Sequence, residues 1–228
     1  MEKRLLVLFL ALSWSGLVCA EAQVYFADDN LKEAVEAELW IPDPTPEDML
    51  GLTSLYAGDD GIIDLTGLES ATNLQTLELP NNDICDIAVL SGLANLRVLS
   101  LRSNRVSDIS ALAGLSNLEE LDLFGNEVSD ISALSSAGNL EILNLQRNEV
   151  SDVSPLSGLS RLRSLDLHRN QVSDIFGLVE LPSLEWLDLR INPLSEETYS
   201  SHIPQMLQNH PGMWLAYYPS TRRRLVLS

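Results

Sequence analysis

Six aspartates recur at intervals of 22 residues, and this regular spacing makes them the first candidates for chemistry in the chain. They are Asp64, Asp86, Asp108, Asp130, Asp152 and Asp174. Carboxylate oxygens are the ligands that Ca²⁺ prefers, so six carboxylates in register could form a calcium-binding stripe. Aspartate also caps short helical turns, and in SDVSPLSGL a proline, Pro155, stands early in the turn that would follow. We favour capping, because it explains both the aspartate and the Ser and Pro residues after it, and we expect no metal.

The remaining reactive side chains do not form a catalytic motif. The histidines are His168, His202 and His210, and their spacing does not match a metal-binding pair such as H-x-x-x-H. The sequence has no G-x-S-x-G, S-x-x-K, Walker-type or dinucleotide-binding motif. The adjacent carboxylates of GDDG, residues 58–61, are typical of a turn. We therefore expect neither an enzyme nor a cofactor.

An internal repeat supplies the elements that must position these residues. Seven 22-residue repeats begin at Leu52, Leu74, Leu96, Leu118, Leu140, Leu162 and Leu184, without insertion or deletion. They follow L-x-x-L-x-L-x-x-N-x-V/I, the leucine-rich repeat signature. The alternation Leu99-Ser100-Leu101 predicts a short strand with its leucines inward, and successive strands would stack about 4.8 Å apart in a parallel sheet. The predicted fold class is α/β: a solenoid of seven turns with short helical turns opposite the sheet, stabilised by contacts between neighbouring turns.

A column of asparagines marks the position where each turn bends inward after its strand. It comprises Asn82, Asn104, Asn126, Asn148, Asn170 and Asn192, and the first repeat has Asp60 instead. A buried side-chain amide carries donors and an acceptor, so it can satisfy backbone groups that the bend leaves unpaired. This asparagine ladder is therefore predicted to be structural.

The segments on either side of the repeats predict caps, because the end turns of a solenoid would otherwise expose their leucines. Residues 21–51 are expected to form a helical N-terminal cap, 52–194 the repeats, 195–219 a C-terminal cap and 220–228 a basic tail. Asp28 or Asp29 would cap the first helix, and Thr45 and Asp48 a second, through a variant capping box. In the C-terminal cap we expect a helix start near Ser195, a short helix at 204–209 and a last edge strand in MWLAYY.

Residues 1–20 have the pattern of a secretory signal. Lys3 and Arg4 precede an apolar stretch, and Val18 and Ala20 stand at the -3 and -1 positions of a cleavage site before Glu21. Lipidation of Cys19 is disfavoured, because the residue before it is not small. Removal of the signal would leave Cys85 without a disulfide partner. The expected destination is secreted, periplasmic or cell-surface.

The acidic balance of the chain disfavours two classes of partner. The formal net charge is -19, from 33 acidic and 14 basic residues. Such a chain repels phosphate backbones and anionic lipid headgroups, so neither nucleic acid nor a membrane surface is expected as a partner. After residue 20 no apolar run approaches the length of a membrane span. We expect a monomer with no membrane insertion.

Three stretches resemble the internalin-type leucine-rich repeat proteins of bacteria. The repeat consensus NxVSDISALxGLxNL carries the resemblance, YFADDNLKEAVEAEL…PTPEDMLGLTSL is similar to the helical cap before such repeats, and NPLSEETYSSHIPQMLQNHPGMWLAYYP is similar to the segment that ends them. The resemblance covers Val24 to Pro219. It implies a right-handed, curved solenoid with a concave parallel sheet and short or 3₁₀ helices on its convex side. It also implies an exported interaction module, secreted or surface-attached, without a catalytic centre.

The outward-facing strand positions are those that the fold leaves free to vary. Large side chains fill the third outward position of five consecutive repeats: Arg102, Phe124, Gln146, His168 and Arg190. Packing of an open sheet does not require them, whereas aromatic residues and arginine anchor protein interfaces. The predicted partner-binding face comprises Arg102, Glu120, Asp122, Phe124, Gln146, Asp166, His168, Trp186 and Arg190. Phe124 has no cap beside it and is therefore the strongest single candidate for a binding residue, whereas Trp186 could equally pack on the C-terminal cap.

These positions predict an exported, non-catalytic scaffold that binds another protein through its concave sheet. Because Glu120, Asp122 and Asp166 flank Phe124, the complementary surface is expected to offer an apolar pocket ringed by basic groups. The alternative is a module that binds a glycan or another surface polymer, with Phe124 and Trp186 stacked on sugar rings. A purely structural surface spacer is the third possibility.

Overall fold

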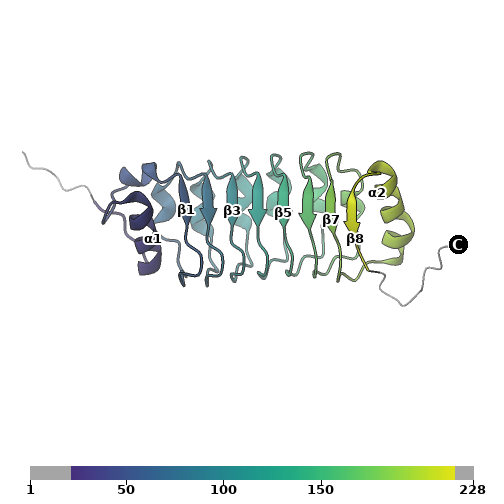
Figure 1. Ribbon diagram of the computed structural model, residues 1–228, viewed down its shortest axis with the longest axis horizontal. Helices are drawn as coiled ribbons and strands as arrows, with labels where there is room; N and C mark the ends of the chain where they lie inside the picture. Colours follow the sequence, from purple (N-terminus) through teal and green to yellow (C-terminus); the bar gives the residue numbers. More distant parts are fainter. Residues whose placement is uncertain (1–21, 219–228) are drawn as a thin grey trace, which may run out of the picture.

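The repeats form one solenoid whose strands make a single sheet (Figure 1). The computed structural model describes residues 22–218, so the expected signal with Cys19, the cleavage site before Glu21 and the basic tail at 220–228 lie outside the described residues. Eight parallel strands lie in the order β1 to β8. They are β1 Ser54–Tyr56, β2 Thr76–Glu78, β3 Val98–Ser100, β4 Glu120–Asp122, β5 Ile142–Asn144, β6 Ser164–Asp166, β7 Trp186–Asp188 and β8 Trp214–Ala216. The predicted repeat fold is confirmed.

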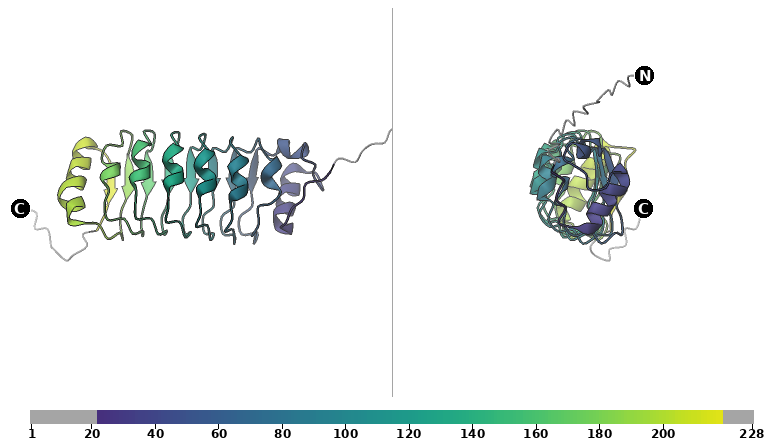
Figure 2. Two further views of the ribbon diagram at one scale, coloured as in Figure 1. Left: turned by 180° about the vertical axis from the view of Figure 1, so that it is seen from behind. Right: turned by 90° about the vertical axis from the view of Figure 1, so that its left-hand side faces the viewer.

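Each turn returns over the opposite face of the sheet through a short 3₁₀ helix (Figure 2). These helices are η1 Asp48–Gly51, η2 Leu68–Ser70, η3 Ala88–Gly92, η4 Ser110–Gly114, η5 Ser132–Ser136, η6 Ser154–Gly158 and η7 Phe176–Leu178. Between the two faces the leucines of successive strands lie in register, as Leu77, Leu99 and Leu121 do, and they are almost completely buried. Burying one such side chain contributes roughly 1.5–3 kcal/mol. A leucine is covered only when the neighbouring turn is in place, so the turns stabilise one another.

The N-terminal end is covered by α1, Asp29–Leu39, followed by η1. The carboxylate of Asp28 accepts hydrogen bonds from the backbone N–H groups of Asn30 at 2.9 Å and Leu31 at 3.2 Å, which begins the helix. Thr45 and Asp48 form a reciprocal capping box: the N–H of Thr45 donates to the Asp48 carboxylate at 2.8 Å, and the N–H of Asp48 donates to the Thr45 hydroxyl at 3.2 Å. Leu31 is completely buried in the core that continues into the first repeat.

The C-terminal end is covered by a single helical segment and β8. A π-helical turn, η8 Thr198–His202, leads directly into α2, Ile203–Asn209. The two short helices expected from the sequence are therefore joined. The helix start expected near Ser195 is confirmed, because helical structure begins at Glu196 and the N–H of Thr198 donates to the Ser195 hydroxyl at 3.1 Å. The buried ring of His202 places its Nδ1 atom 2.9 Å from a carboxylate oxygen of Asp174, so this segment is tied to the last repeats. β8 pairs with β7 at the end of the sheet.

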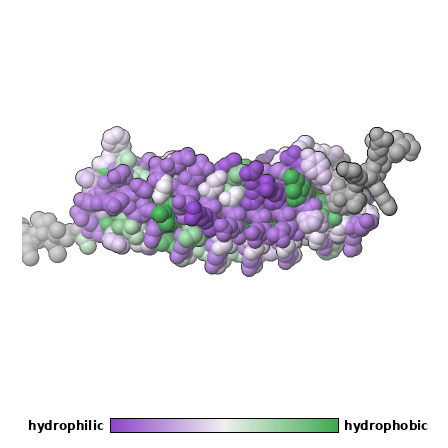
Figure 3. Space-filling view, turned by 90° about the horizontal axis from the view of Figure 1, so that it is seen from below, coloured by the Kyte–Doolittle hydropathy of each residue, from purple (hydrophilic) through white to green (hydrophobic). Residues whose placement is uncertain are grey.

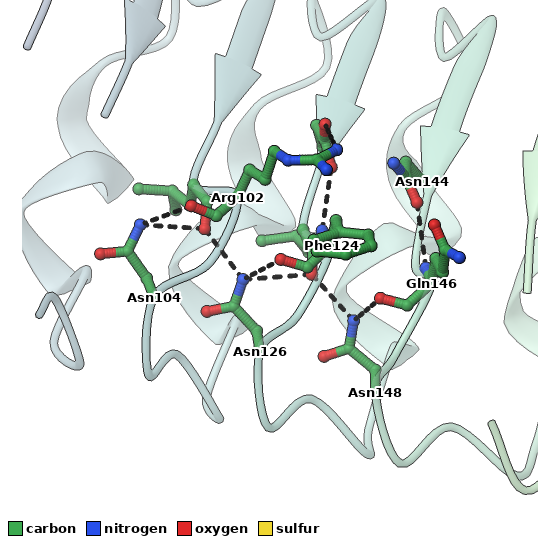
Figure 4. Close-up of polar contacts among 10 residues, drawn as sticks. Arg102, Asn104, Phe124, Asn126, Asn144, Gln146 and Asn148 are labelled. Atoms are coloured by element: carbon green, nitrogen blue, oxygen red, sulfur yellow. Dashed lines mark hydrogen bonds and ion pairs between the residues drawn. The ribbon is translucent and has the colours of Figure 1, made fainter. Parts of the chain in front are cut away.

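The asparagine ladder joins each turn to the one before it (Figure 4). The Nδ2 atom of Asn126 donates to the carbonyl of Leu101 at 2.9 Å in the preceding turn and to the carbonyl of Leu123 at 3.1 Å in its own turn. Its Oδ1 atom accepts from the N–H of Val106 at 2.9 Å, again in the preceding turn. The same three contacts recur along the ladder, and its six side chains are buried. One amide thus satisfies three backbone groups that no strand or helix pairs.

Each aspartate of the column caps the 3₁₀ helix that follows it, and it lies one residue before the usual N-cap position. The carboxylate of Asp108 accepts from the N–H of Ser110, the first residue of η4, at 2.8 Å, and Asp130 accepts from Ser132 at 2.8 Å. Hydrogen bonds from the serine N–H and then from its hydroxyl lower the pKa of Asp108 below its ordinary value, and the same holds for Asp130. One oxygen of each carboxylate, Oδ1, therefore caps the helix that follows it.

A second asparagine column precedes the strands. Asn73, Asn95, Asn117 and Asn139 each donate from Nδ2 to a backbone carbonyl 23 residues earlier, at 2.9–3.0 Å. These bonds are exposed, unlike those of the buried ladder. Neighbouring turns are therefore joined by asparagine at both ends of the strand.

The residue before each ladder position adopts the left-handed backbone conformation. In chain order these residues are Asp59 (φ 64°), Asn81 (φ 56°), Ser103 (φ 54°), Gly125 (φ 65°), Arg147 (φ 58°), Arg169 (φ 60°) and Ile191 (φ 57°). Gly, Asn and Asp tolerate this conformation, whereas a β-branched residue such as Ile191 is strained in it. The turn geometry thus overrides the preference of the individual residue.

Removing one amide of the buried ladder should cost more stability than removing one aspartate cap. Asn148→Ala leaves the buried N–H of Val128 without a partner and removes one of the two amide donors from each of the carbonyls of Leu123 and Leu145, which should reduce the free energy of unfolding by about 1–3 kcal/mol. Asp152→Ala removes one exposed contact to the N–H of Ser154 and should cost about 1 kcal/mol or less. Urea denaturation of both variants measures the difference. A larger loss at Asp152 would contradict this account.

Acid should remove the contribution of the aspartate caps. A carboxyl whose pKa is lowered in the folded state stabilises the fold above its unfolded pKa, about 3.9, and this contribution is lost as the pH falls through the folded value. The double variant Asp108→Ala, Asp130→Ala should therefore melt a few degrees below the parent chain at pH 7, with a much smaller difference at pH 2.5. Thermal denaturation followed by circular dichroism measures both. An equal difference at the two pH values would argue against ionised caps.

Glycine at position 191 should stabilise the protein. Ile191→Gly relieves an exposed β-branched residue in the left-handed conformation and should raise the free energy of unfolding by about 0.5–1 kcal/mol. Ile63 is the matched control, because it is equally exposed and its φ angle is not positive. Ile63→Gly should lower the stability by about 0.5–1 kcal/mol. Urea denaturation measures the free energy of unfolding of both variants. A loss of stability in both would rule out strain at Ile191.

Candidate functional site

The predicted binding residues lie on the open face of the sheet and at the edge where its strands end. Arg102, Phe124, Gln146 and His168 occupy equivalent positions in four successive turns, two residues after β3, β4, β5 and β6. The structure therefore brings these four side chains into one column. The strands run downward in Figure 1, so Figure 3 looks at this edge from below, and the surface there is mostly hydrophilic with small, separate hydrophobic patches.

The ring of Phe124 lies between two guanidinium groups. The guanidinium carbon of Arg102 is 3.9 Å from the centre of the ring, and that of Arg147 is 5.4 Å away. Figure 4 shows Arg102 reaching across to Phe124 from the neighbouring turn. The ring is therefore half-buried, and the side chains that cover it come from neighbouring repeats and not from a cap. Cations over an aromatic face are attracted by its quadrupole, so these contacts hold the ring in place.

The middle outward position of each strand fixes the backbone of this column. Asp122 accepts from the N–H of Phe124 at 2.9 Å, and Asp166 accepts from the N–H of His168 at 2.8 Å. Asn144 does the same for Gln146 at 3.0 Å. These acceptors hold the column in one conformation before any partner arrives.

The column also has contacts of its own. The Nε2 atom of Gln146 lies 2.5 Å from Nδ1 of His168, so the two side chains form a hydrogen-bonded pair. A carboxylate oxygen of Asp122 lies 3.9 Å from the guanidinium of Arg102, a weak ion pair at an exposed site. Burial raises the pKa of Asp166 above its ordinary value. Glu120, by contrast, is exposed beside Phe124.

The C-terminal end of the face belongs to the cap. The indole of Trp186 stacks on that of Trp214 in β8, with the ring centres 4.9 Å apart and the planes 3° from parallel. Asp188 has the same place in its repeat as Asp122 and Asp166, but it is only 1% exposed and forms an ion pair with Arg190. This hydrogen-bonded contact raises the pKa of Arg190. β8 covers these residues, which favours cap packing as the role of Trp186.

Arg147 is the site residue that sequence reasoning missed. It lies in the left-handed column, outside the three outward positions, yet its guanidinium contacts Phe124. The signal available was the period itself, because Arg147 and Arg169 occupy the same position of successive repeats. With His168 and Arg102 they place basic groups along the edge where the strands end. The acidic residues Glu120, Asp122 and Asp166 lie further back on the strands.

The three histidines lie in different parts of the solenoid. His168 lies on the sheet edge, and His202 is buried in the C-terminal cap. His210 lines a surface pocket of about 600 Å³ beside the cap, together with Arg163 and Glu185. Among residues 22–218, no group of three His, Cys, Asp or Glu side chains is arranged to hold a metal ion. In the same range no helix has the length and apolar character needed to cross a membrane, and Cys85 is exposed as a free thiol.

Comparison with known proteins agrees with this architecture. The family described as leucine rich repeats, in two copies, matches residues 94–136 and 138–180. The crystal structure of internalin InlF of Listeria monocytogenes is similar with a TM-score of 0.66 and 28% sequence identity, over 88% of this chain and 72% of that chain. Internalin C2 of the same species has a TM-score of 0.66 and 29% identity, over 86% of this chain and 98% of that chain. No curated protein sequence matches the chain.

A third solved structure shares the fold alone. A leucine-rich repeat protein of Leptospira interrogans has a TM-score of 0.61 and 24% identity, over 68% of this chain and 40% of that chain. The stacked turns, the parallel sheet and the asparagine ladder define a leucine-rich repeat protein. The two Listeria structures show, more closely, that the chain is similar to internalins over most of its length.

Proposed function

We propose that this chain is an exported, non-catalytic scaffold that binds another protein through the open face of its sheet. The observation that carries the proposal is the Phe124 ring, held between two arginines on an otherwise mostly polar surface. An aromatic ring flanked by guanidinium groups combines the two side-chain types most enriched at the energetic centres of interfaces. The predicted contact centres on Arg102, Phe124, Gln146 and His168, with Glu120, Asp122 and Asp166 beside them.

The rigidity of the site supports a binding role. Backbone hydrogen bonds from the middle outward positions fix the column, and the cation–π contacts fix the ring. A side chain that is already ordered loses less conformational entropy when a partner docks, so more of the contact energy is available for affinity. The fold itself does not need a large residue at position 124, because Gly58 and Pro80 stand there in the first two turns.

Export is supported by the pattern of residues 1–20 and by the resemblance to internalin-type proteins. The basic start, apolar stretch and small residues before Glu21 match a secretory signal. Mass spectrometry of the mature protein would identify its first residue.

A glycan-binding role has less support. Stacking on sugar rings requires aromatic faces in line, but Phe124 and Trp186 lie three turns apart in different columns. Trp186 also presents one face of its indole to Trp214. The two rings therefore do not form a shared platform for a chain of sugars.

Phe124→Ala should strongly reduce capture of the partner. With the chain from residue 21 as bait in extracts of the source cells and their medium, quantitative mass spectrometry should identify proteins that the parent chain retains. Loss of a hot-spot ring costs about 2 kcal/mol or more, so retention should fall about thirtyfold. The matched control is Phe176→Ala, which removes an exposed phenyl ring from η7 on the opposite face. Equal loss with both variants, or none with either, would contradict a site on the sheet.

A further inference from the structure

Two neighbouring arginines at the edge of the sheet lack acidic partners. Arg147 and Arg169 are exposed, and among residues 22–218 neither forms an ion pair. Other arginines of the repeats do: Arg97 pairs with Glu119 at 2.7 Å, Arg105 with Asp83 at 3.0 Å and Arg163 with Glu185 at 3.0 Å. In a chain with 33 acidic and 14 basic residues, two adjacent cations without a counter-charge are an exception that calls for a physical reason.

The fold does not require arginine at either position. Asn81, Ser103 and Gly125 occupy the same left-handed position in earlier turns and have lower or comparable cost in that conformation. The backbones of Arg147 and Arg169 lie about one strand spacing, roughly 4.8 Å, apart. Like charges this close repel each other. Neither the turn geometry nor an ion pair therefore accounts for arginine at both positions, which points to a role outside the fold.

Their surroundings indicate the chemistry that they would bind. The Arg147 guanidinium is 5.4 Å from the centre of the Phe124 ring, and the hydrogen-bonded Gln146–His168 pair lies directly before the two arginines in the chain. Guanidinium groups form paired, parallel hydrogen bonds to a carboxylate, and an unpaired guanidinium keeps all of its donors available for one. The ring adds an apolar surface beside this charge.

We propose that Arg147 and Arg169 form a binding site for an acidic side chain of a protein partner, whose neighbouring residue packs on Phe124. The inference rests on the proposed binding function of the sheet and names the chemistry of its partner. It also revises the expected surface around Phe124: the partner presents carboxylate at the edge where the strands end, and basic groups only over Glu120, Asp122 and Asp166.

A protein segment fits this site better than a polyanion does. A polyphosphate or sulfated glycan that lay across the sheet would also meet Glu120, Asp122 and Asp166, a few residues from the arginines. The net charge of -19 opposes the approach of any long anion. A folded protein can instead place a single carboxylate against the arginines and match the acidic strands with lysine or arginine.

The test uses a random twelve-residue peptide library displayed on phage, selected against the mature chain. The enriched peptides should carry Asp or Glu next to an apolar residue. Fluorescence anisotropy with the strongest synthetic peptide should show at least tenfold weaker binding to Arg147→Glu, Arg169→Glu. The matched control is Arg161→Glu, Arg163→Glu, an equal change of charge at the opposite edge of the strands, which should weaken binding less than threefold. Circular dichroism melts confirm that both double variants are folded.

Four outcomes would overturn the proposal: enriched peptides without acidic residues, no enriched peptide, equal weakening of binding by the two double variants, or binding of inorganic polyphosphate through the arginines where peptides do not bind.

The capture experiment with Phe124→Ala is interpreted separately. Captured proteins that depend on Phe124, and that bind the Arg147→Glu, Arg169→Glu variant as tightly as they bind the parent chain, would show that the carboxylate site is wrong. The proposed binding face would then stand. If an acidic peptide binds through the arginines while no captured protein depends on Phe124, the site stands and the proposed face is wrong.

Discussion

The hydrogen bonds of the asparagine ladder are the constraint on which the rest of this structure depends. Each amide bridges two turns, because it donates to one carbonyl in its own turn and to another in the preceding turn. A shift of one residue in any turn would break these bonds and move the leucines out of the core. The ladder thus holds every repeat in the same register, and all surface columns follow from that register.

The fixed register explains which features were predictable from the sequence. Leucine, asparagine and aspartate recur every 22 residues because packing, the inward bend and capping need them, so their positions indicate their roles directly. The resulting sheet and helical turns were predicted correctly. The contacts of Phe124 were not predicted. Arg147 lies in a column whose members share a positive φ angle but not a residue type, because the column holds Arg, Ser, Asn and Ile.

The ends of the solenoid were harder to predict for a different reason. Asp188 has the same place in its repeat as Asp122 and Asp166, yet it is buried, because β8 pairs beside it and Trp214 stacks on Trp186. The strand that covers it comes from outside the repeat pattern, so the period carries no information about this contact. A repeat next to a cap therefore loses surface that an internal repeat keeps.

A binding face on such a scaffold acquires its chemistry from the columns that the ladder leaves free. Glu120, Asp122 and Asp166 are acidic among the free positions of β4 and β6, whereas the edge where the strands end carries Arg147 and Arg169. Two neighbouring bands of opposite charge do not favour any partner with a single dominant charge, because attraction to one band is offset by repulsion from the other. They favour a partner surface on which acidic and basic groups alternate with the same spacing. Phe124, at the boundary between the two bands, adds an apolar contact that neither band has by itself.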